Sequence, residues 1–253
     1  MIKGLYTSFS AMESAWKYQD VIANNIANST TTGFKRETAS QQSFQDVLLS
    51  QQAPVPAPLP ARIQAVVGQI GTGQFLADFS TDFTQGTLVT TGNELDLTTQ
   101  QGFFQVEAPD GTQFATRDGR FGRDANSDLV TSQGYYVLNT SGGHINLPAS
   151  AVSVAADGTI TDGGAPVDQI AVLDYTPGQL TRAGEAYFTS ATAGTQINGG
   201  IRQGSLESSN SDLVEEMTTL LAVQRTFQAN QTILAKLDST LDIAAGQLGQ
   251  VGA

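Results

Sequence analysis

The chain has 253 residues, no cysteine and a formal net charge of −12. The missing cysteines exclude disulfides, thiolate metal sites and a cysteine nucleophile, and a strongly acidic chain is a poor partner for nucleic acid. No run of eighteen apolar residues occurs, so we expect a folded protein without membrane insertion. The first residues lack the apolar core and cleavage site of a signal peptide, so any export would leave the N-terminus uncut.

The N-terminal stretch carries an apolar stripe with helical spacing. Asn, Ser and Thr follow it and compete with the helical backbone, and Gly33 permits a positive φ, so the helix should end near Asn28. The stripe keeps a heptad-like alternation of three and four, with apolar residues at Ile2, Leu5, Phe9, Met12, Trp16, Ala23 and Ile26.

A connector is predicted next, over residues 37–74. Residues 40–52 could form a short helix with Phe44, Val47 and Leu48 on one face. Alternate prolines in residues 53–60 forbid helix and favour an extended polyproline spacer.

Period-two patterning then predicts a central antiparallel β domain, over residues 75–208, as a small barrel or sandwich. Residues 103–106 and 113–116, joined by a Pro109-Asp110-Gly111 turn, indicate a hairpin. Further strands are expected at residues 120–122, 129–131, 135–138, 152–155, 159–161 and 169–174.

A second long helix is predicted from Asp212 to Ala245, with Asp212 as N-cap and Glu215 as its reciprocal acid. At 1.5 Å per residue it would be roughly 50 Å long, so its stripe needs a partner. That partner is either the N-terminal stripe of the same molecule or a copy of the chain. The stripe residues are Leu213, Met217, Leu220, Phe227, Leu234, Leu237, Leu241 and Leu248.

The fold class predicted from these elements is therefore α+β. The N- and C-terminal helices, in residues 1–36 and 209–253, would pair as a coiled-coil-like core domain, with the β domain between them in the sequence.

The sequence offers little for chemistry, and we predict no catalytic, cofactor-binding or metal-ligating residues. The run from Asp124 to Asp128 begins like a calcium loop but has Leu129 where the loop requires glycine. His144 is the single histidine, so no histidine metal cluster can form. Glu94 and Asp96 keep open a less favoured alternative, a carbohydrate-binding or hydrolytic β-domain protein.

Several motifs, in order along nearly the whole chain, resemble the flagellar rod and hook family. The longest is ANNIANSTTTGFK at residues 23–35, and QGFFQV at residues 101–106 is another. The IGTG run at residues 70–73 is similar to the distal-rod type and AGQL at residues 245–248 to the proximal-rod type, and we favour the distal type. The remaining matches lie at residues 1–6, 85–88, 93–97, 116–119, 203–210 and 215–226.

The resemblance implies a non-enzymatic structural subunit of the bacterial flagellar basal body, exported by the flagellar type III machine. The apolar stripes then predict self-assembly into a helical tube, which would transmit torque and enclose the export channel. The expected partners are copies of the chain, other rod and hook proteins and the export apparatus. A hook-type or rod–hook junction subunit is the alternative within the family. The predicted assembly interface comprises Leu5, Phe9, Met12, Trp16, Ile26, Leu213, Met217, Leu220, Phe227, Leu234 and Leu241.

Overall fold

A computed structural model describes residues 2–45, 47–53, 63–148, 152–176 and 178–250. The chain divides into two compact units, one of residues 1–24, 37–81 and 214–253 and the other of residues 25–36 and 82–213. We name them the helical unit and the β unit. Terminal helices combined with antiparallel strands confirm the predicted α+β class, and the described strands form no closed barrel. The three domain ranges proposed from the sequence stay a prediction.

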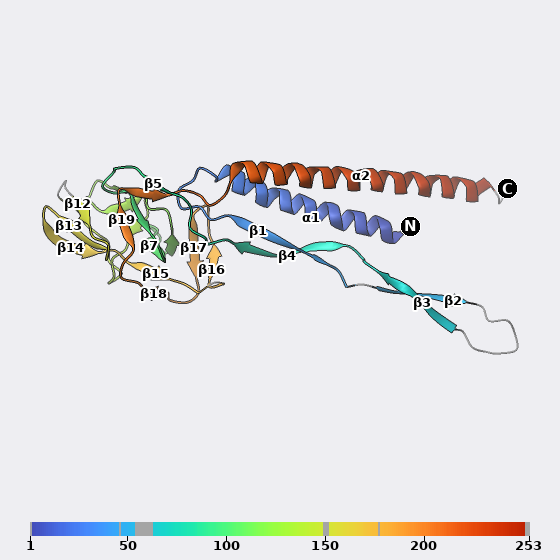
Figure 1. The fold of residues 1–253 in the computed structure, drawn as a ribbon, viewed down its shortest axis with the longest axis horizontal. Coiled ribbons are helices and arrows are strands. Elements are labelled where there is room, and N and C mark those ends of the chain that lie inside the picture. Colours follow the sequence, from blue (N-terminus) through green and yellow to red (C-terminus); the bar gives the residue numbers. More distant parts are fainter. Residues whose placement is uncertain (1, 46, 54–62, 149–151, 177, 251–253) are drawn as a thin grey trace. The chain divides into compact units, whose positions relative to one another are not determined.

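Helices α1 (Ile2–Ala27) and α2 (Leu213–Gln250) run antiparallel within the helical unit (Figure 1). A Cβ placed on Gly4 would lie 3.5 Å from the Cδ1 of Leu237. Further along α1, Met12 lines the same hollow as Phe227. Residue numbers thus increase along α1 in the direction in which they decrease along α2. The two helices of one chain therefore pack antiparallel. Among the described helices, none is long and apolar enough to cross a membrane.

Up to Ala15, the buried residues of α1 are small. Ser8, Ser14 and Ala15 are buried, and Ser14 Oγ donates to the carbonyl of Gln74 at 3.2 Å. The backbone N–H of Gln74 in turn points to Ser10 Oγ at 3.4 Å. Small side chains let neighbouring backbone approach this part of α1 closely. Phe9 and Trp16 remain exposed, whereas Val21 and Ile22, further along the helix, are buried.

From Leu220 on, helix α2 shows a half-buried stripe that follows the spacing predicted for it, whereas the predicted Leu213 and Met217 are exposed. The helix begins directly after Asp212, as an N-cap there requires, and continues through Gly246 to Gln250, beyond the predicted end at Ala245. Helix α1 ends at Ala27, close to the predicted Asn28, and Gly33 has a φ of 68°. The half-buried stripe of α2 comprises Leu220, Val223, Phe227, Asn230, Leu234, Leu237, Leu241 and Ala244.

The short helix predicted for residues 40–52 is wrong, because these residues form strands. Strand β1 (Glu37–Ser43) pairs antiparallel with β4 (Gln74–Thr81), and β2 (Val47–Ala53) pairs with β3 (Ile63–Ile70). Three apolar residues in a short window fit either period, and the backbone partners that select the strands lie outside that window, at residues 63–81. The predicted proline spacer falls mostly in residues 54–62, which lie outside the described residues.

The strands of the β unit are short and all their described pairings are antiparallel. Their bounds are β5 (Leu88–Thr90), β6 (Leu97–Thr99), β7 (Phe103–Glu107), β8 (Gln113–Thr116), β9 (Phe121–Arg123), β10 (Leu129–Thr131), β11 (Tyr136–Val137), β12 (Val152–Val154), β13 (Thr159–Asp162), β14 (Ala165–Gln169), β15 (Val172–Asp174), β16 (Leu180–Arg182), β17 (Tyr187–Ser190), β18 (Thr195–Gln196), β19 (Ile201–Gln203) and β20 (Ser205–Glu207).

A 9-stranded sheet in the order β16-β17-β8-β7-β11-β10-β9, with β15 and β18 attached through β7, is the largest element of the β unit. The predicted hairpin is confirmed as β7 and β8, whose turn is closed by a bond from Ala108 N–H to the Thr112 carbonyl at 2.9 Å. The strands expected between residues 120 and 161 correspond to β9 to β13, whereas residues 169–174 divide between β14 and β15. Smaller sheets pair β12-β13-β14, β19-β6 and β20-β5.

Alternate residues of these strands build one contiguous apolar core, as expected for sheets with one buried face. Phe104, Val106 and Val137 are fully buried in it, and the Phe104 ring meets Phe121 edge-on at 5.2 Å. A smaller cluster places Phe103, Ala115 and Phe188 together. The β unit therefore has a core of its own, which the stability of a separate unit requires.

Tyr187 of this core supplies a test by pH. Burial raises the pKa of Tyr187 from 10.0 to about 12. Between these values the folded chain keeps a proton that the unfolded chain releases, so the free energy of unfolding should fall as pH rises from 10 to 12. Urea denaturation at pH 9, 10 and 11 measures this slope. The Tyr187→Phe variant should lose part of it, and an unchanged slope in that variant would contradict the assignment.

Candidate assembly surface

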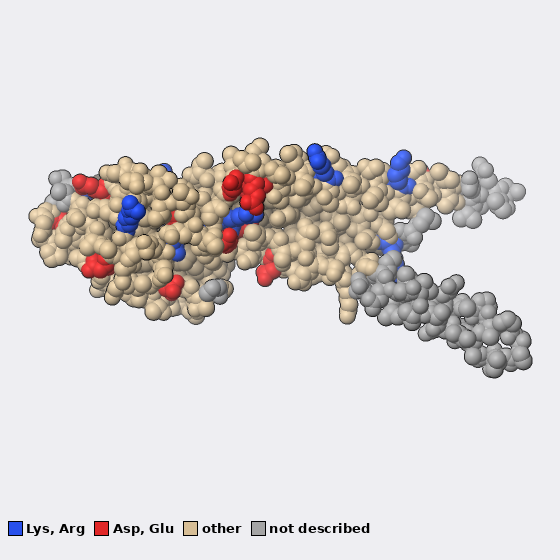
Figure 2. Space-filling model, viewed as in Figure 1, with Lys and Arg blue, Asp and Glu red and all other residues tan. Residues whose placement is uncertain are grey.

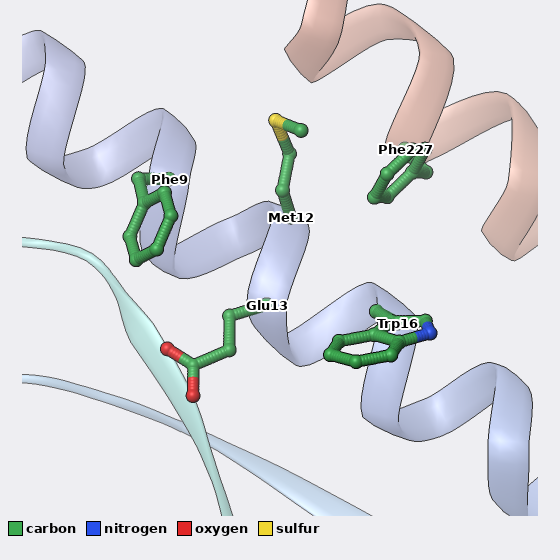
Figure 3. A pocket seen from close by; sticks show the side chains of 5 residues that line it. All are labelled: Phe9, Met12, Glu13, Trp16 and Phe227. Carbon is green, nitrogen blue, oxygen red and sulfur yellow. The ribbon is translucent and has the colours of Figure 1, made fainter.

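A hollow of about 540 Å³ opens on the surface of the helical unit between the two helices. Phe9, Met12 and Trp16 of α1 line it together with Phe227 of α2. Figure 3 shows Met12 extending into the space beside Phe227, while the carboxylate of Glu13 points away from that ring. Glu13 instead pairs with Lys17 at 2.8 Å. The hollow is thus an apolar surface whose one acid is neutralised by its neighbour.

The aromatic side chains around this hollow are unusually exposed for their size. Phe9 is 57% exposed and Trp16 is 61% exposed. Phe9 also borders a second hollow, of about 460 Å³, together with Tyr6 and Phe44. The Phe44 ring lies 5.0 Å from that of Phe75. An apolar band therefore runs across α1 from α2 to β4, and contiguous apolar surface of this kind usually marks an interaction site.

The predicted interface residues divide into half-buried and exposed groups. Phe9, Met12, Trp16 and Phe227 are brought together at the hollow, whereas Ile26 and Leu213 belong to the β unit. That any of them contacts another subunit stays a prediction. The half-buried residues are Leu5, Met12, Ile26, Leu220, Phe227, Leu234 and Leu241, and the exposed residues are Phe9, Trp16, Leu213 and Met217.

The sequence interpretation missed several apolar residues of this surface. Tyr6 is 65% exposed beside Phe9, and Phe44 belongs to the loop after β1. On α2, Val214 and Leu221 are exposed at 72% and 56% and lie outside the predicted stripe. A search for every large apolar residue outside the best heptad register would have found them, because a soluble helix seldom needs apolar residues on two faces.

Charge is sparse on the helical unit. Figure 2 shows few Lys, Arg, Asp or Glu side chains interrupting this unit on the face in view. Glu215 and Glu216 lie in the first turn of α2, where acids stabilise the positive end of the helix dipole. The surface is therefore suited to apolar contact rather than to binding a charged ligand.

The residues considered for chemistry have structural roles. Asp96 is buried and accepts hydrogen bonds from Thr91 Oγ1 at 2.6 Å and Asn93 Nδ2 at 3.1 Å. Glu94 Oε2 lies 3.4 Å from the backbone N–H of Val152. Asp124 Oδ1 accepts the backbone N–H groups of Asn126 and Asp128, both at 2.8 Å, which makes the run a turn.

Metal ligands are not clustered in the part of the chain that the structure describes, where no group of three His, Asp or Glu side chains could hold an ion. His144 stacks on Tyr136 with ring centroids 4.2 Å apart, and its Nε2 lies 3.8 Å from Glu107. The described histidine is therefore engaged with the β11 surface.

Comparison with known proteins assigns the chain. Family models match residues 5–35 as a flagella basal body rod protein, residues 99–162 as the flagellar hook protein FlgE/F/G D1 domain and residues 202–247 as the flagellar basal body rod FlgEFG protein C-terminal. The flagellar basal-body rod protein FlgG of Bacillus subtilis is 34% identical, over 95% of this chain and 97% of its own length. The chain belongs to the flagellar basal-body rod protein family.

Other relatives refine the position within the rod family. The FlgG protein of Agrobacterium fabrum is 33% identical over 98% of this chain and 100% of its own length. The FlgF protein of Caulobacter vibrioides is 31% identical over 100% of this chain and 99% of its own length. The preference for the distal-rod (FlgG) type over the proximal-rod (FlgF) type is thereby confirmed, with FlgG favoured. Two of the family models cover most of α1 and most of α2, which together line the apolar hollow.

Proposed function

We propose that the chain is a structural subunit of the flagellar basal-body rod, which polymerises with copies of itself through its terminal helices. The observation that carries this proposal is the exposed apolar hollow of Phe9, Met12, Trp16 and Phe227. A single molecule leaves these aromatic rings in water. A neighbouring helix of a second copy would cover them.

Burial of the hollow supplies the energy for assembly. Covering an exposed Phe or Trp side chain is worth about 1.5–3 kcal/mol, at roughly 25 cal/mol per Å² of apolar surface. The hollow is concave, whereas the exposed Val214, Met217 and Leu221 project from α2. A contact between two copies that uses a different surface on each copy is called heterologous. A heterologous contact that does not close a ring generates an open helical filament. Such a filament of helices would form the tube that transmits torque and encloses the export channel.

Family membership supports a place in the basal body, among other basal-body components. We propose further that other rod and hook proteins cap this polymer at its ends. The subunit would reach that place through the flagellar export apparatus, without a cleaved signal peptide. We assign it no catalytic role, because the candidate acids Glu94 and Asp96 are engaged in local hydrogen bonds.

Within the same family, a hook-type or rod–hook junction subunit is the second candidate. It is favoured by the match of residues 99–162 to a domain shared by hook and rod proteins. The two roles differ in the curvature of the polymer and in its neighbours. A carbohydrate-binding or hydrolytic β unit would instead require turnover or glycan binding that is lost on changing Glu94 or Asp96.

Electron microscopy of the purified chain at rising concentration tests the proposal. We expect the full chain to form straight filaments. A chain limited to residues 25–213, which keeps the β unit and residues 37–81 of the helical unit but lacks nearly all of both helices, should stay monomeric and folded. The truncation stops at residue 25 because residues 25–36 belong to the β unit. Curved filaments would favour the hook-type subunit. Filaments from the truncated chain, or a full chain that stays monomeric, would refute assembly through the helices.

A further inference from the structure

A cluster of buried charges lies in the β unit, between the chain segments that follow α1 and precede α2. Lys35 comes after the end of α1 at Ala27, and Glu207 comes before the start of α2 at Leu213. Lys35 Nζ donates to Glu207 Oε1 at 2.5 Å, although 172 positions separate the two residues. Their exposed fractions are 0% and 2%. Together with Arg117 they form what we name the junction cluster.

Glu207 serves two cations with its two oxygens. Arg117 Nη1 lies 3.3 Å from Glu207 Oε2 and 3.2 Å from the Thr99 carbonyl. The Arg117 guanidinium also lies over the Phe103 ring, 4.8 Å from its centroid. Glu207 Oε1 accepts a further bond from the backbone N–H of Gly86 at 2.9 Å. One carboxylate therefore pairs with both neighbouring cations and accepts a bond from a backbone donor.

Backbone bonds tie the same two segments together on either side of the cluster. The N–H of Gly33 donates to the carbonyl of Glu207 at 2.8 Å. The N–H of Arg36 donates to Asn210 Oδ1 at 2.7 Å, and Asn210 Nδ2 donates to the Asp82 carbonyl at 2.8 Å. Residues 33–36 and 207–210 are thus joined at several points. The bonds between these two segments cannot form while either segment is unfolded.

Because the charges of the junction cluster are buried, the loss of stability should depend on which of its residues is replaced. Burial lowers the pKa of Lys35 and of Arg117, and the Glu207 carboxylate acts in the opposite direction on both. Without Glu207, two buried cations would remain with their paired carboxylate gone, which is strongly unfavourable. Without Lys35, the pair of Arg117 and Glu207 would remain. Loss of the carboxylate should therefore cost much more than loss of the lysine.

We propose that the junction cluster couples the folding of the segment leaving α1 to the folding of the segment entering α2. Glu207 supplies the negative charge that buried Lys35 needs, and Lys35 adds a second cation to the one that Arg117 gives Glu207, so the two segments dock more stably together than either does alone. The coupling holds within one molecule, and the inference stands whether or not the chain polymerises. For assembly, this means that when one of the two segments is unfolded, the segments next to both terminal helices are no longer held in place.

Hydrogen exchange on the full chain, below the concentration at which it polymerises, tests the coupling through its reciprocity. Glu207→Gln should raise exchange at Gly33 and Arg36, in the N-terminal segment, by about tenfold or more. Lys35→Met should raise exchange at Ser208, in the C-terminal segment, by a smaller factor. Amides in the core of the β unit, such as Leu129 and Ala155, should keep their protection.

The matched control is Glu107→Gln, which removes the same charge at a partly exposed position of the β unit. It should leave both segments protected. The proposal is overturned if Glu207→Gln behaves like this control, or if each variant loosens only the segment that contains it. If Glu207→Gln does not fold, hydrogen exchange at Ser208 in the Lys35→Met variant tests the coupling by itself.

Discussion

Replacing Gly119 by alanine is expected to unfold the β unit at room temperature or to lower its stability severely. A Cβ placed on Gly119 would lie 1.5 Å from the carbonyl oxygen of Leu97 and 2.7 Å from its carbonyl carbon. The same two residues are tied by a bond from the Leu97 N–H to the Gly119 carbonyl at 2.9 Å. Backbone on both sides cannot rotate away as a side chain would, so we expect a loss of about 3 kcal/mol or more.

Urea denaturation followed by circular dichroism measures this loss, and Gly122→Ala is its matched control. No described heavy atom outside the adjoining residues lies within 4 Å of a Cβ placed on Gly122, which belongs to β9. That variant should stay within about 0.5 kcal/mol of the parent chain. Equal losses in the two variants would show that the close approach of residues 97 and 119 is not what requires glycine.

Removing the aromatic rings of the apolar hollow should abolish polymerisation at concentrations where the parent chain assembles. Trp16→Ala removes a side chain that is 61% exposed in the single molecule, so the variant should fold normally. At about 1.5–3 kcal/mol for each ring buried, the critical concentration should rise roughly tenfold to a hundredfold for one change. Combining it with Phe9→Ala should raise the critical concentration further.

Sedimentation of the polymer at a series of concentrations gives the critical value for each variant. Val167→Ala is the control, because Val167 is 46% exposed on β14 of the β unit. This variant should polymerise as the parent chain does. Assembly of the double variant at the parental concentration would exclude the hollow as an interface and leave the exposed face of α2 to explain polymerisation.

The candidate site was predictable from the sequence in its location but not in its geometry. The apolar spacing of residues 1–28 and 213–248 points to two helices with unsatisfied stripes, and the structure has these helices. Spacing within one helix cannot tell which face its own chain covers. On α1, the small residues Ser8, Ser14 and Ala15 are buried together with Val21 and Ile22, whereas Phe9 and Trp16 remain exposed.

Elements whose signals are local can be predicted from the amino-acid sequence alone. The hairpin of β7 and β8 follows from period two with a turn in between, and the start of α2 follows from an N-cap at Asp212. Each of these signals can be recognised within about fifteen residues, because helix and turn preferences depend on near neighbours.

Features that depend on contacts between distant residues could not be predicted in this way. Residues 40–52 became strands because their antiparallel partners lie at residues 63–81. Gly119 is required by the Leu97 carbonyl, and Lys35 is buried because Glu207 neutralises it from 172 positions away. The strand pairing, the close backbone contact and the buried ion pair each form between segments that only the fold brings together. Their energies therefore leave no pattern in a short stretch of sequence.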